Sequence, residues 1–228
     1  MIPLTDSVNG IINGNRKGGS IIYSNFLKLD MEKRQRILNA AMKEFAQQGY
    51  KNASTDNIVK EAAISKGALF HYFKNKKGLF LYLYNYALDI MKNEILMKID
   101  LNEKDVFKRR RGSILNKIEI CKIHPEIYDF LTTAYLDDAS DIKNDIQSTN
   151  NKLMAYGKSI LYEGLDTSMF REGVEVCRAV EIINWTDEGF SKKITAQIKY
   201  KLLDQQDYDE MLKEWDIYMD ILKKSFYK

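Results

Sequence analysis

The sequence predicts an all-α protein, and three observations support that prediction. Only two prolines occur in 228 residues, so long helices can run without interruption. From residue 31 onward apolar residues recur every three or four positions, which is the period of a helix buried on one face. No alternating strand pattern competes with this period after residue 31. The content of 45% hydrophobic and 29% charged residues is typical of a globular protein with a core.

The first thirty residues differ from the rest of the chain. Residues 1–30 have no clear period and contain Asn-Gly and Gly-Gly pairs, which are turn and flexibility signals. A weak hairpin between Ile11-Ile12 and Ile21–Tyr23 is one alternative. We expect instead a disordered or dispensable N-terminal extension, with the patterned part of the chain beginning at Met31.

Four helices are expected between residues 31 and 98, each with a recognisable start or stop signal. Gly49 ends the first helix. Ser54 or Thr55 caps the second, Ser65 the third and Asn75 the fourth, because their side-chain oxygens can accept from the free amides at a helix start. The expected ranges are about 32–48, 55–62, 66–72 and 76–98.

Five further helices are expected in the remainder of the chain. Asn102 and Asp207 are the expected caps of the first and the last of them. Pro125 lies where a first-turn proline is tolerated. The expected ranges are about 103–122, 125–137, 142–163, 174–201 and 207–226.

Basic residues concentrate in one part of the chain. Residues 31–80 hold ten Lys or Arg and four Asp or Glu, whereas the whole chain carries a net charge of only +3. Residues 81–228 are therefore net acidic. A basic segment joined to an acidic one suggests a polyanion-binding head on a body with another role. A solvated charged face explains the charge alone equally well.

The second and third expected helices, joined by a tight turn at Ala63-Ile64, form a helix-turn-helix. In this motif the N-terminal end of the second helix meets base edges while flanking groups hold phosphates. Lys66 and Gly67 lie at that leading end. Because Gly67 has no side chain, the backbone there can approach DNA closely.

Four segments of this region follow a known pattern: ILNAAMKEF at 37–45, Gly49-Tyr50, STDNI at 54–58 and AAISKGALFHYFKNK at 62–76. With these segments, residues 31–80 resemble the DNA-binding domain of the TetR family of bacterial regulators. The family's recognition helix commonly reads Ser-Lys-Gly-Thr/Ala-Leu-Tyr-x-Tyr-Phe followed by Lys-x-Lys, and the run from Ala62 to Lys76 is therefore the most specific part of the match.

Two residues depart from the family pattern. Phe70 stands where the family usually has tyrosine, so one polar DNA contact is lost. Ala63 stands where glycine is common in the turn. If that position requires a positive φ, alanine adds roughly 1 kcal/mol of strain.

The resemblance implies a role for each matching residue of the head. Lys66, Ala68 and His71 would face base edges, and Tyr72 would give its hydroxyl to a phosphate. Ser54, Thr55 and Lys76 would hold the DNA backbone on either side, with Ser65 as a cap that also reaches phosphate. The complete predicted DNA-binding set is Ser54, Thr55, Ser65, Lys66, Gly67, Ala68, Phe70, His71, Tyr72 and Lys76.

The resemblance also implies the organisation of the rest of the chain. Residues 1–30 would be the extension, 31–78 the helix-turn-helix domain and 79–228 a helical effector-binding and dimerisation domain. The last two helices would pair with their copies across a two-fold axis, so that a symmetric pair reads two half-sites. The alternative is that their apolar stripes line the monomer core. The predicted dimerisation residues are Ile183, Trp185, Phe190, Trp215, Met219 and Leu222.

Together these features predict a ligand-responsive DNA-binding transcription regulator, most simply a repressor of a palindromic operator. Its expected partners are double-stranded DNA, a second copy of the chain and an unidentified small-molecule effector, whose binding residues the sequence does not single out. The alternative function is that of a helical small-molecule-binding or scaffolding protein that no longer reads DNA, which Phe70 and Ala63 would favour.

Other functional classes lack their characteristic residues. Cys121 and His124 have a metal-like spacing, but no second pair completes a tetrahedral site, so we expect no metal and no other cofactor. No histidine has a nucleophile and an acid in its sequence context, so we do not expect an enzyme. No apolar run reaches the roughly 20 residues that span a bilayer, and no signal peptide is recognisable, so we expect a cytoplasmic protein.

Two charged runs are also given structural interpretations. The run Arg109–Arg111 is expected to be a solvated face of its helix, although it could supplement the binding of DNA or of an acidic ligand. The acidic residues Asp137, Asp138 and Asp141 lie near an expected connection between helices and need no catalytic role.

Overall fold

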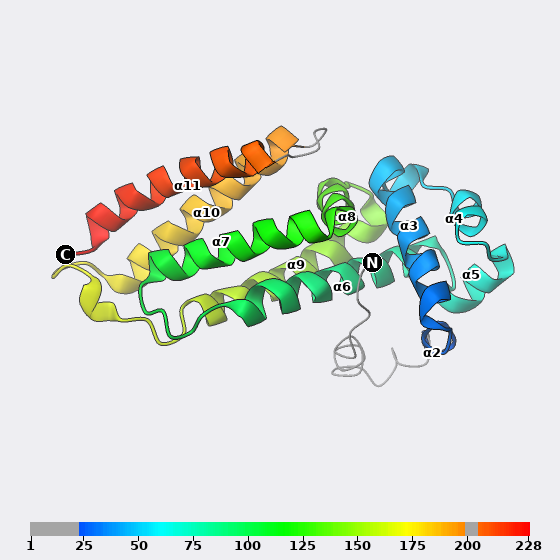
Figure 1. The fold of residues 1–228 in the computed structure, drawn as a ribbon, viewed down its shortest axis with the longest axis horizontal. Helices are drawn as coiled ribbons and strands as arrows, with labels where there is room; N and C mark the ends of the chain where they lie inside the picture. The colour runs from blue at the N-terminus through cyan, green and yellow to red at the C-terminus, as the bar shows by residue number, and fades with distance from the viewer. Residues whose placement is uncertain (1–22, 199–204) are drawn as a thin grey trace. The chain divides into compact units, whose positions relative to one another are not determined.

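The structure is a computed structural model that describes residues 23–198 and 205–228. In these residues no β-strand occurs, and a single isolated bridge pairs Phe170 with Tyr227. The predicted all-α fold is confirmed (Figure 1). None of the described helices combines the length and the apolar character needed to cross a membrane. The helices are α2 (Ser24–Leu27), α3 (Met31–Asn52), α4 (Thr55–Glu61), α5 (Lys66–Phe73), α6 (Lys76–Ile95), η1 (Leu96–Lys98), α7 (Val106–Ile123), α8 (Pro125–Leu136), α9 (Ser140–Leu161), η2 (Thr167–Met169), α10 (Val176–Ile198) and α11 (Gln205–Phe226).

Every helix expected from residue 31 onward is present, with differences at the ends. Gly49 has a φ of 69° inside α3 and interrupts its helical geometry, as its predicted role as a stop requires. Asp105 caps α7 in place of Asn102, because its carboxylate accepts from the Phe107 amide at 2.9 Å. Asp207 lies in the first turn of α11 and not at its cap, since that helix begins at Gln205. The predicted end of α10 at 199–201 lies outside the described residues.

The chain divides into two compact units, and the division passes through η1, α7 and α9. The first unit comprises the described residues up to Met97 together with Glu119–Tyr156, and the second comprises Lys98–Ile118 and Gly157–Lys228. The first unit thus combines the helix-turn-helix with α6, α8 and most of α9. The expected boundary after residue 78 separates a DNA-binding part from an effector-binding part rather than two compact units, and it stays a prediction.

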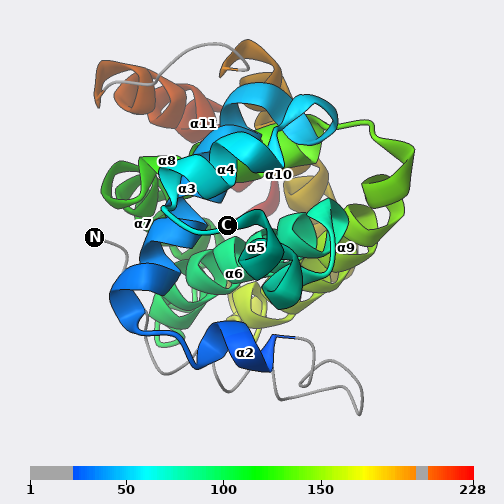
Figure 2. The same ribbon diagram turned by 90° about the vertical axis from the view of Figure 1, so that its right-hand side faces the viewer.

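The core of the first unit is rich in aromatic rings. Phe45 meets Phe80 edge-on with ring centroids 5.0 Å apart, and Phe80 meets Phe130 at 5.5 Å. These rings come from α3, α6 and α8, so one continuous core holds the helix-turn-helix against the start of the body. Figure 2 shows α3, α4 and α5 of this unit from the side on which the predicted recognition helix lies.

The last residues of the predicted extension are part of this core. Residues 24–27 form α2, and Phe26 is only 1% exposed, with its ring 4.8 Å from that of Phe73. The expectation of disorder is therefore wrong for residues 23–29, because an aromatic side chain there finds a cluster of rings to join. Residues 1–22, including the possible hairpin, lie outside the described residues.

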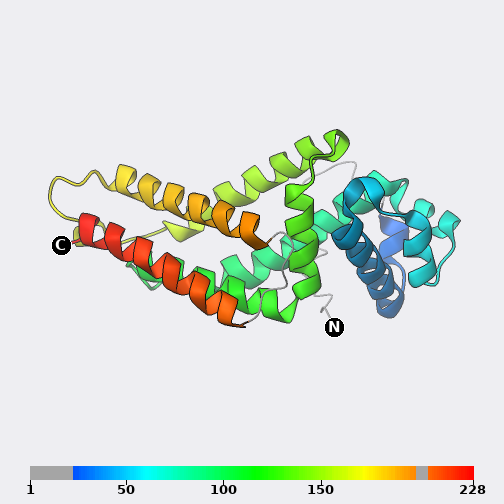
Figure 3. The same ribbon diagram turned by 90° about the horizontal axis from the view of Figure 1, so that it is seen from above.

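The second unit has its own core, in which α10 and α11 lie side by side (Figure 3). Ile183, Trp215 and Met219 are buried in it, so they are covered within the protomer and cannot form an interface surface. The predicted dimerisation role is wrong for these three residues, since their stripes pack against each other as the monomer-core alternative held. Phe190 and Leu222 are partly buried against the same core.

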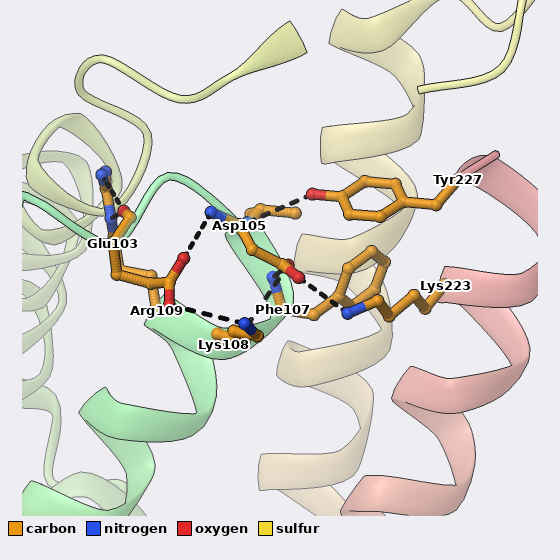
Figure 4. A network of polar contacts seen from close by, with 8 residues as sticks. Glu103, Asp105, Phe107, Lys108, Arg109, Lys223 and Tyr227 are labelled. Atoms are coloured by element: carbon orange, nitrogen blue, oxygen red, sulfur yellow. Dashed lines mark hydrogen bonds and ion pairs between the residues drawn. The ribbon is translucent and has the colours of Figure 1, made fainter. Parts of the chain in front are cut away.

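A network of polar contacts joins the start of α7 to the end of α11 (Figure 4). The Asp105 carboxylate accepts from Lys223 Nζ at 2.7 Å, and the Tyr227 hydroxyl accepts from the Val106 amide at 3.2 Å. Burial alone would raise the pKa of Asp105, but hydrogen bonds from Lys223 and from backbone amides hold it below its usual value. The network therefore fixes the C-terminal residues of the chain to this unit.

Arg109 is buried, which contradicts the expected solvated face of the arginine run. Its guanidinium donates to the carbonyl oxygens of Glu103, at 2.8 Å from Nε, and of Glu163, at 2.6 Å. Both carbonyls lie outside regular helices and need a donor when they are covered. Arg109 thus ties the segment before α7 to the segment after α9.

Candidate nucleic-acid interface

The first helix of the motif, α4, begins at a well-satisfied cap. The Ser54 hydroxyl accepts from the Asn57 amide at 3.3 Å, so Ser54, rather than Thr55, is the capping residue. The Ser54 amide itself donates to a Glu44 carboxylate oxygen at 2.7 Å. This bond fixes the start of α4 to α3, and it leaves Thr55 half-buried in the first turn.

The turn between α4 and α5 places a strained residue at Ala63. Its φ is 53°, in the left-handed region that glycine adopts without cost. The Ile64 amide closes the turn by donating to the Val59 carbonyl at 3.0 Å. The strain that was expected for alanine at a positive φ is therefore present at Ala63, and the turn still forms its hydrogen bonds.

Helix α5 presents one face to solvent and packs the other. Ser65 caps it, accepting from the Ala68 amide at 3.1 Å. Leu69 and Phe73 are buried, whereas Lys66, Gly67 and His71 are exposed. The sequence folds in this way because its apolar residues fall four apart on a helix of only eight residues. The exposed face of α5 is therefore a polar surface that begins at a capped N-terminus.

Lys66 lies at that leading end and is held only loosely. Its ammonium forms an ion pair with Asp56 at 2.8 Å, and both side chains are at least half exposed. An exposed ion pair contributes at most about 1 kcal/mol. Lys66 can therefore exchange its carboxylate partner for a base or a phosphate at little cost.

Three of the predicted contact residues are less exposed than the prediction requires. Tyr72 is 9% exposed, with its ring 6.0 Å from that of Phe26, so the α2 helix covers much of it. Phe70 and Ala68 are half-buried. The hydroxyl contact of Tyr72 with a phosphate stays a prediction, but most of its ring belongs to the core.

Lys76 makes a different contact from the one expected. Its ammonium donates to the carbonyl oxygens of Lys51 and Ala53, each at 2.9 Å, and lies 5.2 Å from the centroid of the Tyr50 ring. Two of its three donors thus close the end of α3. In this arrangement Lys76 organises the head, and its predicted contact with the DNA backbone stays a prediction.

The end of α5 turns sharply into α6. The Asn75 amide donates to the Phe73 carbonyl at 2.8 Å across Lys74, whose φ of 65° and ψ of −52° define a γ-turn. A Cβ atom at Gly78 would lie 2.1 Å from the Phe73 carbonyl oxygen. Only glycine therefore allows α6 to begin so close to the end of α5.

A clamp that the sequence did not reveal holds the end of α3. The Tyr50 amide donates to Asp137 Oδ2 at 2.7 Å, and the Tyr50 hydroxyl donates to Asp141 Oδ2 at 2.6 Å. Burial raises the pKa of Tyr50, and the hydrogen bond to Asp141 raises it further. Asp137 directly follows α8, and Asp141 lies in the first turn of α9. Their clustering was the only available signal, because nothing local pairs them with Tyr50.

A buried polar network in the second unit also escaped the sequence prediction. The Arg110 guanidinium forms an ion pair with Asp187, and it donates to the Tyr162 hydroxyl and, at 3.0 Å, to the Asn184 side-chain oxygen. Trp215 Nε1 donates to Asp187 at 2.7 Å. Burial lowers the pKa of Arg110. A charge this well covered needs such partners, so Arg110 is not the solvated residue that its sequence context predicted.

In the part of the chain that the structure describes, no three His, Cys, Asp or Glu side chains are grouped as a metal ion would require. Cys121 and His124 are both buried.

Comparison with known proteins bears directly on this helix-turn-helix. Residues 37–83 match the family model described as bacterial regulatory proteins of the tetR family. The helix-turn-helix segment of the chain is thus similar to the TetR family. The matched segment covers α4 and α5 completely and reaches from α3 into α6, so it contains the whole helix-turn-helix with the exposed face of α5.

Two curated relatives come from Bacillus subtilis (strain 168). The uncharacterized HTH-type transcriptional regulator YuxN is 47% identical over 58 residues, which are 25% of this chain and 20% of YuxN. The match to YuxN thus spans about a fifth of that protein. The fatty acid metabolism regulator protein is 24% identical over 179 residues, which are 78% of this chain and 91% of that protein.

Solved structures share the fold over most of the chain. A TetR family transcriptional regulator from Chloroflexus aurantiacus J-10-fl has a TM-score of 0.63 and 21% identity, covering 90% of this chain and 98% of its own. A TetR-like regulator from Rhodococcus sp. RHA1 has a TM-score of 0.62 and 16% identity, covering 85% and 99%. At these identities the likeness concerns the fold.

Proposed function

We propose that this chain is a homodimeric repressor of the TetR family that binds a palindromic operator and releases it when a small-molecule effector binds. The observation that carries the proposal is the exposed face of α5, on which Lys66 and Gly67 lie at a capped helix start and His71 lies in the last turn, while the opposite face is buried. A helix of this kind can enter a major groove without breaking any core contact.

Exposed apolar residues on the last two helices support the dimer. Trp185 on α10 is 64% exposed, and Ile182 lies three residues before it on the same face. On α11, Ile217, Tyr218 and Ile221 are exposed as well. Large apolar side chains gathered on two adjacent helices are costly in water and typical of a protein interface. Of the residues predicted from the sequence, Trp185 therefore remains the strongest candidate for the interface.

The Tyr50 clamp suggests how an effector would act on DNA binding. The residues that hold the end of α3 are Asp137, at the end of α8, and Asp141, in the first turn of α9, and α9 continues into the second unit. An effector that favours a different position of these two residues changes the placement of the head. Linkage then requires the effector and the operator to weaken each other's binding.

The chemical class of the effector follows from one relative and one side chain. One of the two Bacillus subtilis relatives is named as a fatty acid metabolism regulator protein, so fatty acids are the first candidates. Arg110 is the candidate to hold an acidic headgroup, because its buried Nε has no hydrogen-bond partner among the residues described.

DNA binding is tested by selection from a library of randomised duplexes at low salt, followed by anisotropy titration of the recovered sequence. We expect a palindromic site that the Lys66→Ala variant binds more weakly and the Lys213→Ala variant binds normally, because Lys213 is an exposed residue of α11. If no duplex is enriched, the rival function of a protein that no longer reads DNA is preferred.

The dimer and the effector are tested separately. Trp185→Glu is expected to give monomers in sedimentation equilibrium and to weaken binding to the palindrome, whereas Lys117→Glu, at an exposed residue of α7, is not. Fatty acids of 12 to 18 carbons are titrated into the protein–operator complex. Release that Arg110→Met abolishes and Arg111→Met preserves would support the headgroup assignment, because Arg111 is exposed and paired with Asp216.

A further inference from the structure

The short helix α2 lies directly against the recognition helix α5, although it precedes the family's matched segment. Phe26 anchors it with ring centroids 4.8 Å from Phe73 and 5.3 Å from Tyr82. Tyr23 adds a second ring, 4.7 Å from Tyr82. Four residues cannot form a stable helix alone, so these contacts hold α2 in place.

One polar side chain of α2 reaches the DNA-facing surface of α5. The Asn25 side-chain nitrogen lies 2.8 Å from His71 Nε2, and both residues are exposed. Asn25 and His71 are 46 residues apart in the sequence, so only the docking of α2 brings them together. His71 is the one imidazole on the exposed face of α5.

The contact decides which ring nitrogen of His71 remains for DNA. With Nε2 occupied by the Asn25 amide, Nδ1 is the free nitrogen. When the amide donates, Nε2 must be unprotonated, so the neutral ring carries its proton on Nδ1. Nδ1–H is then a donor, and the acceptors it can meet in a major groove are guanine N7 and O6, adenine N7 and thymine O4.

We propose that Asn25 is a positioning residue for base recognition: it engages Nε2 of His71, fixes the orientation of the ring and leaves Nδ1 to select the base that His71 reads. This inference rests on the proposed placement of α5 in the major groove. It adds to that function a specificity-determining residue outside the helix-turn-helix.

Asn25 is suited to this role because its side chain lies outside the core. Phe26, the next residue, supplies the buried anchor of α2, whereas the Asn25 side chain is exposed. The bond between Asn25 and His71 in water would be weak if both side chains were mobile. Because Phe26 anchors α2, the Asn25 amide is already held beside His71, so DNA binding loses less side-chain entropy.

The test compares base preferences, measured by sequencing duplexes that the full-length protein selects from a randomised library. The variants are Asn25→Ala, Asn25→Asp, His71→Ala and the double variant, with Asn85→Ala as control because Asn85 is an exposed amide on α6. Thermal unfolding of each variant accompanies the selection, and Phe26→Ala shows the effect of undocking α2.

We expect Asn25→Ala and His71→Ala to lose preference at the same base pair of each half-site, by about 5- to 10-fold, and the double variant to lose no more than His71→Ala. Asn25→Asp accepts but does not donate, so it should change the preferred base there. Unaltered preferences in Asn25→Ala, or a uniform loss at all positions, would overturn the inference while leaving the proposed function intact. If the unmodified protein selects no duplex, both are overturned.

Discussion

The clamp on Tyr50 makes a prediction that can be worked from its geometry. Changing Tyr50 to Phe removes the hydroxyl that donates to Asp141 at 2.6 Å and leaves the ring in the core. The ring stacks on Phe45 with centroids 6.4 Å apart, and this contact survives the change. The substitution therefore isolates one hydrogen bond between the head and the first turn of α9.

The magnitude follows from the charge and exposure of the partners. A hydrogen bond to a charged group contributes about 1.5–3 kcal/mol, and water screening at an exposed carboxylate reduces the contribution below that range. Asp141 is exposed, so we expect Tyr50→Phe to lower the free energy of unfolding by about 1 kcal/mol. Asp137 is half-buried and also accepts from the Ala139 amide at 2.9 Å, so Asp137→Ala should cost about 2 kcal/mol.

A double-mutant cycle in urea measures the coupling directly. Tyr50→Phe combined with Asp141→Asn should show a coupling energy of about 1 kcal/mol. The matched control pairs Tyr50→Phe with Asp138→Asn, because Asp138 is exposed and contacts only Lys51, at 3.5 Å, in the described structure. A cycle for Asp141 that is as additive as the control would refute the clamp. The same variants should weaken the effect of an effector on operator affinity.

Three further outcomes concern single positions. Ala63→Gly should stabilise the protein by at most about 1 kcal/mol in thermal unfolding, because glycine relieves the strain at a φ of 53°. The greater freedom of glycine in the unfolded chain offsets part of this gain. A loss of stability would show that the turn does not hold this conformation. Gly78→Ala should cost about 3 kcal/mol, since its Cβ would lie 2.1 Å from a backbone oxygen, and an unchanged melting temperature would contradict that close approach. Burial raises the pKa of Asp89 from 3.8 to about 6, so the folded state binds a proton that the unfolded state has released, and stability should rise as pH falls from about 6 to about 4. Asp89→Asn should remove that rise and add about 1 kcal/mol at pH 7.5, after allowance for partial exposure, and a pH profile identical to that of the unmodified protein would exclude the effect.

Local signals in the sequence were sufficient to predict the helices and most of their starts. Ser54, Ser65 and Asn75 cap the helices that they were expected to cap, because a cap depends on a side chain and an amide only three residues away. Gly49 interrupts α3 for an equally local reason. The exposed face of α5 follows from the four-residue spacing of its buried side chains.

The roles of side chains that bond across the fold could not be predicted in this way. Lys76 was expected to meet phosphate, and in the structure it closes the end of α3, more than twenty residues earlier in the chain. Arg110 stands in a basic run that is typical of a solvated face, yet the packing of α10 covers it and supplies Asp187 as its partner. Neither contact could be predicted from the ten or so neighbouring residues in the sequence, because the partners lie much farther along the chain.

The sequence by itself therefore determined the all-α fold, the helix-turn-helix and the residues that α5 presents, because periodicity and capping act between near neighbours. Only the tertiary structure decided that Phe26 docks α2 beside His71, that Asp137 and Asp141 hold Tyr50, and that Trp215 is core while Trp185 is surface. These depend on which helices meet and at what rotation. A repeat of three or four residues fixes which face of a helix is apolar, but it leaves open which neighbour covers that face.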